Sequence, residues 1–101
     1  MVLTGLGKQP FARPFNSGSP DGELVVLEGD VERVLLTRSG GHMILIVHNT
    51  SVFLPADVAE KTVLNIGDRI SVSGTVQTYR GNKEIIVGAA EDIRIMKSAN
   101  P

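Results

Sequence analysis

Hydrophobic and polar residues alternate most regularly between residues 69 and 80. One face of this stretch carries Ile70, Val72, Gly74, Val76 and Thr78. Successive side chains of a strand point to opposite faces, so this period of two predicts a strand with one buried face. Residues 80–83 contain glycine and asparagine and predict a hairpin turn. Residues 84–87 resume the sheet, and after a break the strand pattern continues through residues 93–95.

The first half of the folded region predicts three further strands and one short helix. Residues 24–37 alternate imperfectly around Gly29, where we expect a bulge or a bend. Residues 42–48 are apolar on both faces, and residues 51–54 form a short strand that ends at a proline. Residues 57–64 place apolar side chains at helical spacing over about two turns. The predicted order is therefore β-β-β-α-β-β.

Residues 1–23 show no usable periodicity. They contain three of the five prolines and four glycines, which is typical of an irregular arm. Two alternatives remain for this arm: Phe11 and Phe15 attach it to the folded domain, or it is a mobile tail. We expect the folded domain to span residues 24–97 and a C-terminal tail to span residues 98–101.

Composition limits the classes of protein that the chain can represent. The 101 residues are enough for one small domain with one core. There is no cysteine, which excludes disulfides and thiolate zinc sites and favours a cytoplasmic location. No apolar stretch approaches the roughly 20 residues that span a bilayer, and we expect no secretory signal and no membrane partner. The net charge is −1, so any site for a polyanion must be local.

Three sequence segments carry a resemblance to a known family. They are LEGDVERV at residues 27–34, LNIGDRISVSGTVQTYRGNKEIIV at residues 64–87, and EDIRI at residues 91–95. Together they resemble the OB-fold nucleic-acid-binding family, of the type found in tRNA-anticodon-binding domains, exonuclease subunits and replication-protein-A-like single-strand binders. The resemblance implies an all-β, five-stranded Greek-key OB barrel with one short helix between strands three and four. Members of the family usually carry aromatic residues on the second and third strands, and this sequence has none on the second.

The resemblance also implies where a ligand would bind. The binding face of the fold lies across its second and third strands, between the first loop and the last hairpin. The candidate nucleic-acid-binding residues are Arg38, His42, Phe53, Tyr79, Arg80, Asn82 and Lys83. Basic side chains would contact phosphates, rings would stack on bases, and Asn82 would read a base edge. Two alternatives stay open: exposed hairpin turns commonly contain such residues, and a lone aromatic such as Phe53 is more often part of a core.

Enzyme chemistry has little support in the sequence. Glu28, Asp30 and Glu32 share a strand face without a base, a nucleophile or a metal-binding companion, so we expect a solvated face. His42 and His48 match no metal-binding spacing, and we expect neither a metal nor another cofactor.

The sequence therefore predicts a non-enzymatic module that binds single-stranded DNA or RNA with modest affinity and low sequence specificity. The alternative is an OB-fold interaction or assembly module that does not bind nucleic acid. A larger nucleic-acid-processing protein or a second copy of the chain would then be its partner.

Overall fold

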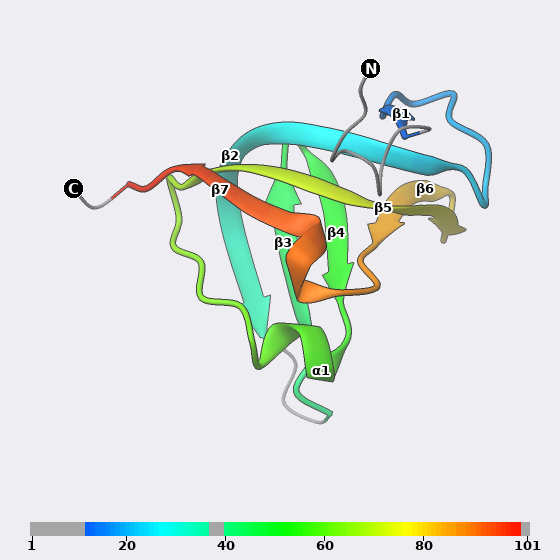
Figure 1. Ribbon diagram of the computed structural model, residues 1–101. Helices are drawn as coiled ribbons and strands as arrows, with labels where there is room; N and C mark the ends of the chain where they lie inside the picture. The colour runs from blue at the N-terminus through cyan, green and yellow to red at the C-terminus, as the bar shows by residue number, and fades with distance from the viewer. Residues whose placement is uncertain (1–11, 37–39, 100–101) are drawn as a thin grey trace, which may run out of the picture.

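The structure, a computed structural model, describes residues 12–36 and 40–99. Its elements follow the predicted order, with one additional strand at the start and a 3₁₀ turn before the last strand (Figure 1). They are β1 (Arg13–Pro14), β2 (Leu24–Leu36), β3 (Met43–Val47), β4 (Thr50–Leu54), α1 (Ala56–Ala59), β5 (Arg69–Tyr79), β6 (Asn82–Ile86), η2 (Ala90–Asp92) and β7 (Ile93–Lys97).

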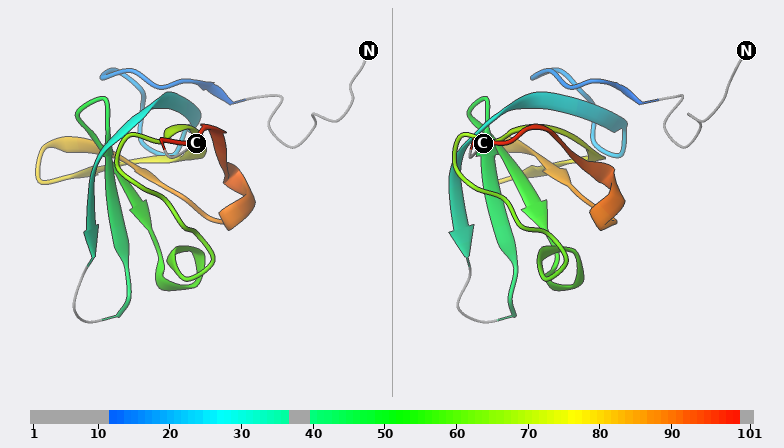
Figure 2. Two further views of the ribbon diagram at one scale, coloured as in Figure 1. Left: turned by 90° about the vertical axis from the view of Figure 1, so that its left-hand side faces the viewer. Right: turned by 60° about the vertical axis from the view of Figure 1, so that its left-hand side comes forward.

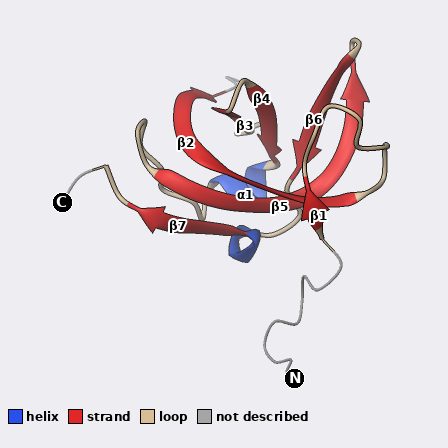
Figure 3. Cartoon of the chain, turned by 90° about the horizontal axis from the view of Figure 1, so that it is seen from above, coloured by secondary structure: helices blue, strands red, loops and turns tan. Residues whose placement is uncertain are grey.

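Five of the strands close into a barrel. Antiparallel pairs join β2 to β3, β3 to β4, β5 to β6 and β2 to β5, and a parallel pair between β4 and β6 completes the ring. The view from above shows this ring of strands, with α1 beneath it (Figure 3). The predicted fold class, an all-β OB barrel with one short helix between the third and fourth barrel strands, is confirmed.

The long strand β2 takes part in both halves of the barrel. Its first half pairs with β5 and its second half pairs with β3. The bulge lies between Val31 and Arg33, so the expectation of an irregularity at Gly29 was displaced by a few residues. Gly29 serves packing instead, because a Cβ on it would lie 2.5 Å from Cδ2 of His48. The extra residue shifts the alternation, so Val34 packs on the core while Arg33 points outward.

The helix α1 is shorter than its hydrophobic pattern predicts. It covers one end of the barrel with Val58 and Ala59, which are buried (Figure 1). It ends in tight i→i−3 hydrogen bonds, and Val63, which the prediction placed on the buried face, is 79% exposed. The β-branched residues Thr62 and Val63 lower helix propensity there, and only one turn has a core to pack on. No helix in the described part of the chain is long and apolar enough to cross a membrane.

The last strand is interrupted, as the sequence predicts. Both β6 and β7 pair antiparallel with β5, and residues 87–92 separate them. The inward face of β5 is buried from Ile70 to Val76 as expected, and there it packs with side chains from every barrel strand and from α1, whereas Thr78, expected in the same row, is exposed beyond the core. The core is Val25, Leu27, Val31, Met43, Leu45, Val47, Val52, Leu54, Val58, Ala59, Ile70, Val72, Val76, Ile85 and Val87.

The described part of the N-terminal arm is attached to the barrel. Strand β1 pairs in parallel with the start of β2, and Phe15 packs against the core. The backbones of Gly22 and Glu23 then form hydrogen bonds of 2.8 and 3.0 Å with the backbone of Val76 on β5. Of the two alternatives for the arm, attachment holds for residues 12–23, whereas Phe11 lies outside the described residues.

Candidate nucleic-acid interface

The outer side of three neighbouring strands forms one continuous surface, which we call the β3–β4–β6 face. On β3 the odd-numbered residues are buried and the even-numbered ones are half-buried, so the even-numbered side chains point outward. The same alternation holds on β4 and β6. The face consists of Ile44, Ile46, Ser51, Phe53, Glu84 and Ile86.

An apolar band crosses this face. Ile44 lies opposite Phe53, Phe53 lies opposite Ile86, and Leu35 of β2 extends the row beyond Ile44. Side chains directly opposite on neighbouring strands touch each other on a shared face. Leu35 is 40% exposed and the other three side chains are half-buried. The band therefore presents apolar surface to solvent on the side where this fold binds its ligands.

His42 and Phe53 lie together at one end of the face. Their ring centroids are 5.2 Å apart, with planes inclined by 34°. Phe53 is half-buried and is not among the buried core residues, so its ring belongs to the outer face. The two rings form one candidate platform for stacking a base.

The β5–β6 hairpin carries a second aromatic side chain, that of Tyr79. The hairpin itself projects beyond the barrel (Figure 2). Tyr79 and Asn82 are the last cross-strand pair, and Arg80 and Gly81 form the turn with φ values of 53° and 83°. Two positive φ values define a type I′ turn, which matches the twist of a hairpin. Tyr79 is 51% exposed, and the guanidinium carbon of Arg80 lies 5.2 Å from its ring centroid.

The two ring platforms lie on the same side of the sheet. Thr75 of β5 lies opposite Ile86, so it marks the point on β5 that is level with Phe53 and the apolar band. Tyr79 is four residues further along β5. At 3.3 Å per residue the platforms are about 13 Å apart along β5. Glu84 lies in the row between them, opposite Ser51 and Gln77, and partial burial raises the pKa of its carboxyl.

Lys83 does not belong to this surface. It lies opposite Thr78, one position along from the Tyr79 pair, so it points to the other side of the hairpin. There its Nζ lies 3.3 Å from Oδ1 of Asp21, which also accepts a 2.7 Å hydrogen bond from the Thr78 hydroxyl. These two contacts, the Thr78 bond first, lower the pKa of Asp21. Arg38 lies outside the described residues.

The fold adds a cation that the sequence pattern did not indicate. Arg33 lies opposite Ile46, is exposed and points outward beside the apolar band. Counting alternate residues from Val31 places Arg33 inside the barrel, and only the bulge turns it outward. The described cations at this surface are therefore Arg33 and Arg80, with Glu84 as an opposing charge between the ring platforms.

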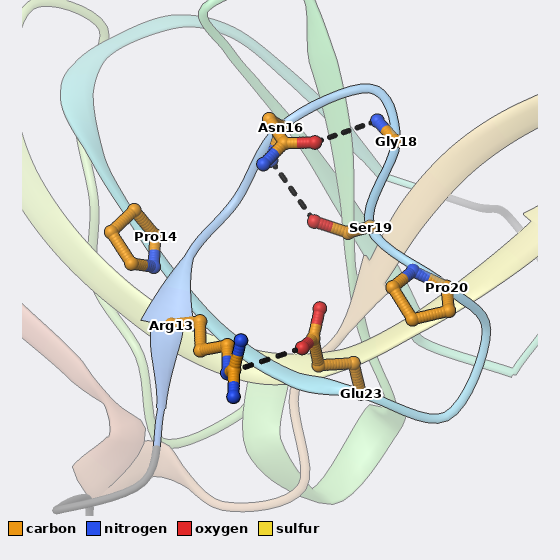
Figure 4. Close-up of a pocket in the computed structure, with 7 residues that line it drawn as sticks. All are labelled: Arg13, Pro14, Asn16, Gly18, Ser19, Pro20 and Glu23. Carbon is orange, nitrogen blue, oxygen red and sulfur yellow. Dashed lines mark hydrogen bonds and ion pairs between the residues drawn. The ribbon is translucent and has the colours of Figure 1, made fainter.

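A separate shallow groove of about 540 Å³ lies in the N-terminal segment (Figure 4). It is lined by Arg13, Pro14, Asn16, Gly18, Ser19, Pro20 and Glu23. Its polar groups bind one another: Arg13 lies 3.6 Å from Glu23, and the Asn16 side chain accepts the Gly18 N–H at 2.7 Å. Within the described ranges, no group of three or more potential metal ligands occurs.

No protein-family model matches the sequence, and neither does any curated protein. Solved structures do resemble the chain. Asparaginyl-tRNA synthetase from Pyrococcus horikoshii has a TM-score of 0.61 and 21% identity, over 78% of this chain and 21% of the synthetase. The same enzyme complexed with asparaginyl-adenylate has the same TM-score and identity, over 20% of its length. OBody AM1L10 bound to hen egg-white lysozyme has a TM-score of 0.61 and 22% identity, over 78% of this chain and 83% of that one.

The chain thus spans about a fifth of the length of the synthetases that it resembles. Similarity at this level of identity concerns the fold, and together with the closed five-stranded ring it shows that the chain has the OB fold.

Proposed function

We propose that this chain is a non-enzymatic module that binds single-stranded nucleic acid on the β3–β4–β6 face. The observation that carries the proposal is the presence of two ring platforms, His42 with Phe53 and Tyr79 with Arg80, on one side of the sheet. Bases of any sequence stack on aromatic rings, and exposed arginines contact the phosphates between them. Asn82, the cross-strand neighbour of Tyr79, would contact a base edge.

The similarity to asparaginyl-tRNA synthetase favours RNA over DNA as the polymer. The binding itself is weak and of low sequence specificity, because the described surface offers few polar groups for reading base edges. Arg33 and Arg80 are the cations described on this surface, and Glu84 repels phosphates between the ring platforms. Two phosphate contacts to a single strand give a logarithmic salt slope of about −1.4 at roughly 0.7 per contact.

The direct test is a titration of labelled single-stranded RNA and DNA oligonucleotides at low and moderate salt. Tyr79→Ala removes the exposed platform, and a base stacked there contributes about 1–3 kcal/mol, so the affinity should fall about tenfold to hundredfold. Thermal stability should hardly change, because the ring is half exposed at the end of a hairpin. Tyr79→Phe is the matched control and should bind as the wild type does. An affinity unchanged by Tyr79→Ala in a folded protein would contradict the assigned surface.

A second function has one specific observation in its favour. The apolar band of Leu35, Ile44, Phe53 and Ile86 is also a suitable surface for a protein partner. OBody AM1L10, whose structure resembles this chain, is bound to a folded protein, lysozyme. If this second function holds, another copy of the chain covers the band. The mass of the protein in solution then distinguishes self-association from nucleic-acid binding by a monomer.

A further inference from the structure

The inner side of the β5–β6 hairpin carries a pair of polar side chains that lies beyond the barrel core. Thr78 and Lys83 lie opposite each other, next to the buried pair Val76 and Ile85 on the same side. The hairpin extends past β4 here, because the pairing between β4 and β6 begins only at Glu84. The side chains of Thr78 and Lys83 therefore face the N-terminal segment instead of the core.

The side chain of Asp21, from the N-terminal segment, lies against Thr78 and Lys83. A single carboxylate oxygen, Oδ1, accepts the Thr78 hydroxyl at 2.7 Å and lies 3.3 Å from the Lys83 ammonium. The backbone of the next two residues is hydrogen-bonded to Val76, which holds the carboxylate over the hairpin. A hydroxyl and an ammonium that converge on one anionic oxygen are also the donors that proteins use for a phosphate oxygen.

We infer that Thr78 and Lys83 form an anion site for a phosphate group, and that Asp21 is its built-in occupant and competes with a phosphate-bearing ligand. The inference rests on the proposed function in one respect: the phosphate belongs to the part of the bound strand that continues from Tyr79 and Arg80 around the tip of the hairpin to its other side, where Lys83 lies. The Asp21 side chain is 59% exposed and that of Lys83 is 29% exposed, so solvent and ligands reach the pair. Exposed ion pairs are weak, which allows a phosphate to replace the carboxylate.

The competition has a consequence for selectivity. While Asp21 holds Lys83, the hairpin offers only Arg80 to a passing polyanion, and nonspecific binding stays low. A strand that is already held by the ring platforms presents its phosphate at high local concentration and can displace Asp21. Asp21 thus sets the affinity of the module without touching a base.

The test compares two variants that remove the same charge from the same segment. Asp21→Asn removes the charge that holds Lys83, and its neutral amide competes only weakly with a phosphate for Thr78 and Lys83. Glu23→Gln is the matched control, because it neutralises a carboxylate that pairs with Arg13 and not with Lys83 (Figure 4). At about 50 mM salt, Asp21→Asn should bind an oligouridine RNA about twofold to fivefold more tightly than Glu23→Gln, the range that one exposed ion pair supports. Its salt slope should be steeper by about 0.7, the value of one added contact.

The higher RNA affinity of Asp21→Asn must depend on Lys83. Adding Lys83→Met to Asp21→Asn should abolish it, whereas Lys83→Met in the wild type should change the affinity little. Asp21→Ser, which retains a small polar side chain without charge, replaces Asp21→Asn if the amide perturbs the fold. Equal gains from Asp21→Asn and Glu23→Gln would show a net-charge effect and overturn the inference.

A second measurement tests the anion site without RNA. Inorganic phosphate, compared with chloride at equal ionic strength, should shift the NMR amide signals of Thr78 and Lys83 in Asp21→Asn but not in the wild type or in Glu23→Gln. If phosphate does so while no variant binds RNA or DNA, the proposed function fails and the anion site stands. If phosphate shifts neither signal and RNA affinity is unaffected by Asp21→Asn, the anion site is overturned while the proposed function stands on the Tyr79 result.

Discussion

Gly74 shows how a single residue shapes the barrel. It lies on the inward face of β5 just before that strand turns to pair with β6. A Cβ on Gly74 would overlap the carbonyl oxygen of Ile86 and lie 2.6 Å from Cγ2 of Ile85. The backbone of β6 cannot move away without breaking its pairing, so the position requires a residue without a side chain.

Gly74→Ala should therefore lower the free energy of unfolding by about 1–3 kcal/mol, the cost of overpacking a core position. Denaturant unfolding measures the change. Gly88→Ala is the control, because a Cβ at this exposed position meets no atom within 4 Å, and the substitution should be neutral or slightly stabilising. Equal stability of Gly74→Ala and the wild type would contradict the close approach of β6 to β5.

Asp68 joins the C-terminal segment to the loop before β5. Its residue is 1% exposed, and its two carboxylate oxygens each accept a 2.8 Å hydrogen bond, one from the Ala99 N–H and one from the Asn65 N–H. These two bonds, the Ala99 bond first, lower the pKa of the carboxyl below its ordinary value of 3.8. A group with a depressed pKa in the folded state stabilises the fold in its charged form.

The contribution of Asp68 should thus be complete at neutral pH and be lost as the pH falls from about 4 through the folded-state pKa. Asp68→Asn should be less stable than the wild type at pH 7, because an amide NH₂ would face an N–H donor. The stability difference should narrow below about pH 4. Thermal melts at a series of pH values measure it, and a difference that is constant down to pH 2 would show that the carboxylate does not accept these bonds.

At the scale of one element, the β5–β6 hairpin combines a structural role and the proposed binding role in the same residues. Arg80 occupies the first position of a type I′ turn with φ 53°, a conformation that asparagine and glycine adopt more readily than arginine. Its guanidinium group nevertheless lies over the Tyr79 ring and presents a cation at the tip. The hairpin thus carries a residue that its turn does not favour, which is typical of a functional position.

Arg80→Asn separates the two roles. Asparagine followed by Gly81 is a favoured type I′ pair, so the variant should be as stable as the wild type or more so. RNA affinity should decrease, and the magnitude of the salt slope should fall by about 0.7 because one phosphate contact is lost. Thermal melts and titrations at several salt concentrations measure the two effects. A variant that retains the wild-type slope would place the phosphate contacts elsewhere.

At the scale of the whole molecule, closure of the barrel gives the chain two unlike sides. The closed ring leaves β2, β3, β4, β5 and β6 few free backbone groups, so the outer side chains decide what binds. On the β3–β4–β6 face and the adjoining end of the β5–β6 hairpin, these are an apolar band, two ring platforms and few charges. The acidic row of Glu28, Asp30 and Glu32 points outward on the part of β2 before and at the bulge and would repel a polyanion there.

The mass of the protein in solution should distinguish the two uses of that face. A nucleic-acid module should be a monomer of 10.8 kDa by light scattering after size exclusion. Ile44→Asp should then lower RNA affinity through repulsion without changing the mass. Leu36→Asp is the control, because Leu36 is 70% exposed at the end of β2 and outside the apolar band. A wild-type dimer that Ile44→Asp dissociates and Leu36→Asp does not would support the second function instead.

The local pattern of the sequence determined the elements and, where it alternates, which face is buried. The period of two over β5 and the interrupted last strand follow from the preference of apolar side chains for the core, which acts residue by residue. Residues 43–47 of β3 are all apolar, so the pattern alone did not decide that Ile44 and Ile46 point outward. The pattern of turn residues likewise determined the hairpin at Arg80. The helix was placed correctly but extended too far, because its length depends on how much core lies beneath it.

Only the tertiary structure decided how the candidate residues are grouped. The bulge after Val31 brought Arg33 to the edge of the β3–β4–β6 face, although its position in the alternation pointed inward. Cross-strand register placed Lys83 on the opposite side of the hairpin from Tyr79, and the path of the N-terminal segment brought Asp21 to it across 62 residues of sequence. These relations depend on strand register and on contacts between distant segments, and neither leaves a local periodic signal in the chain.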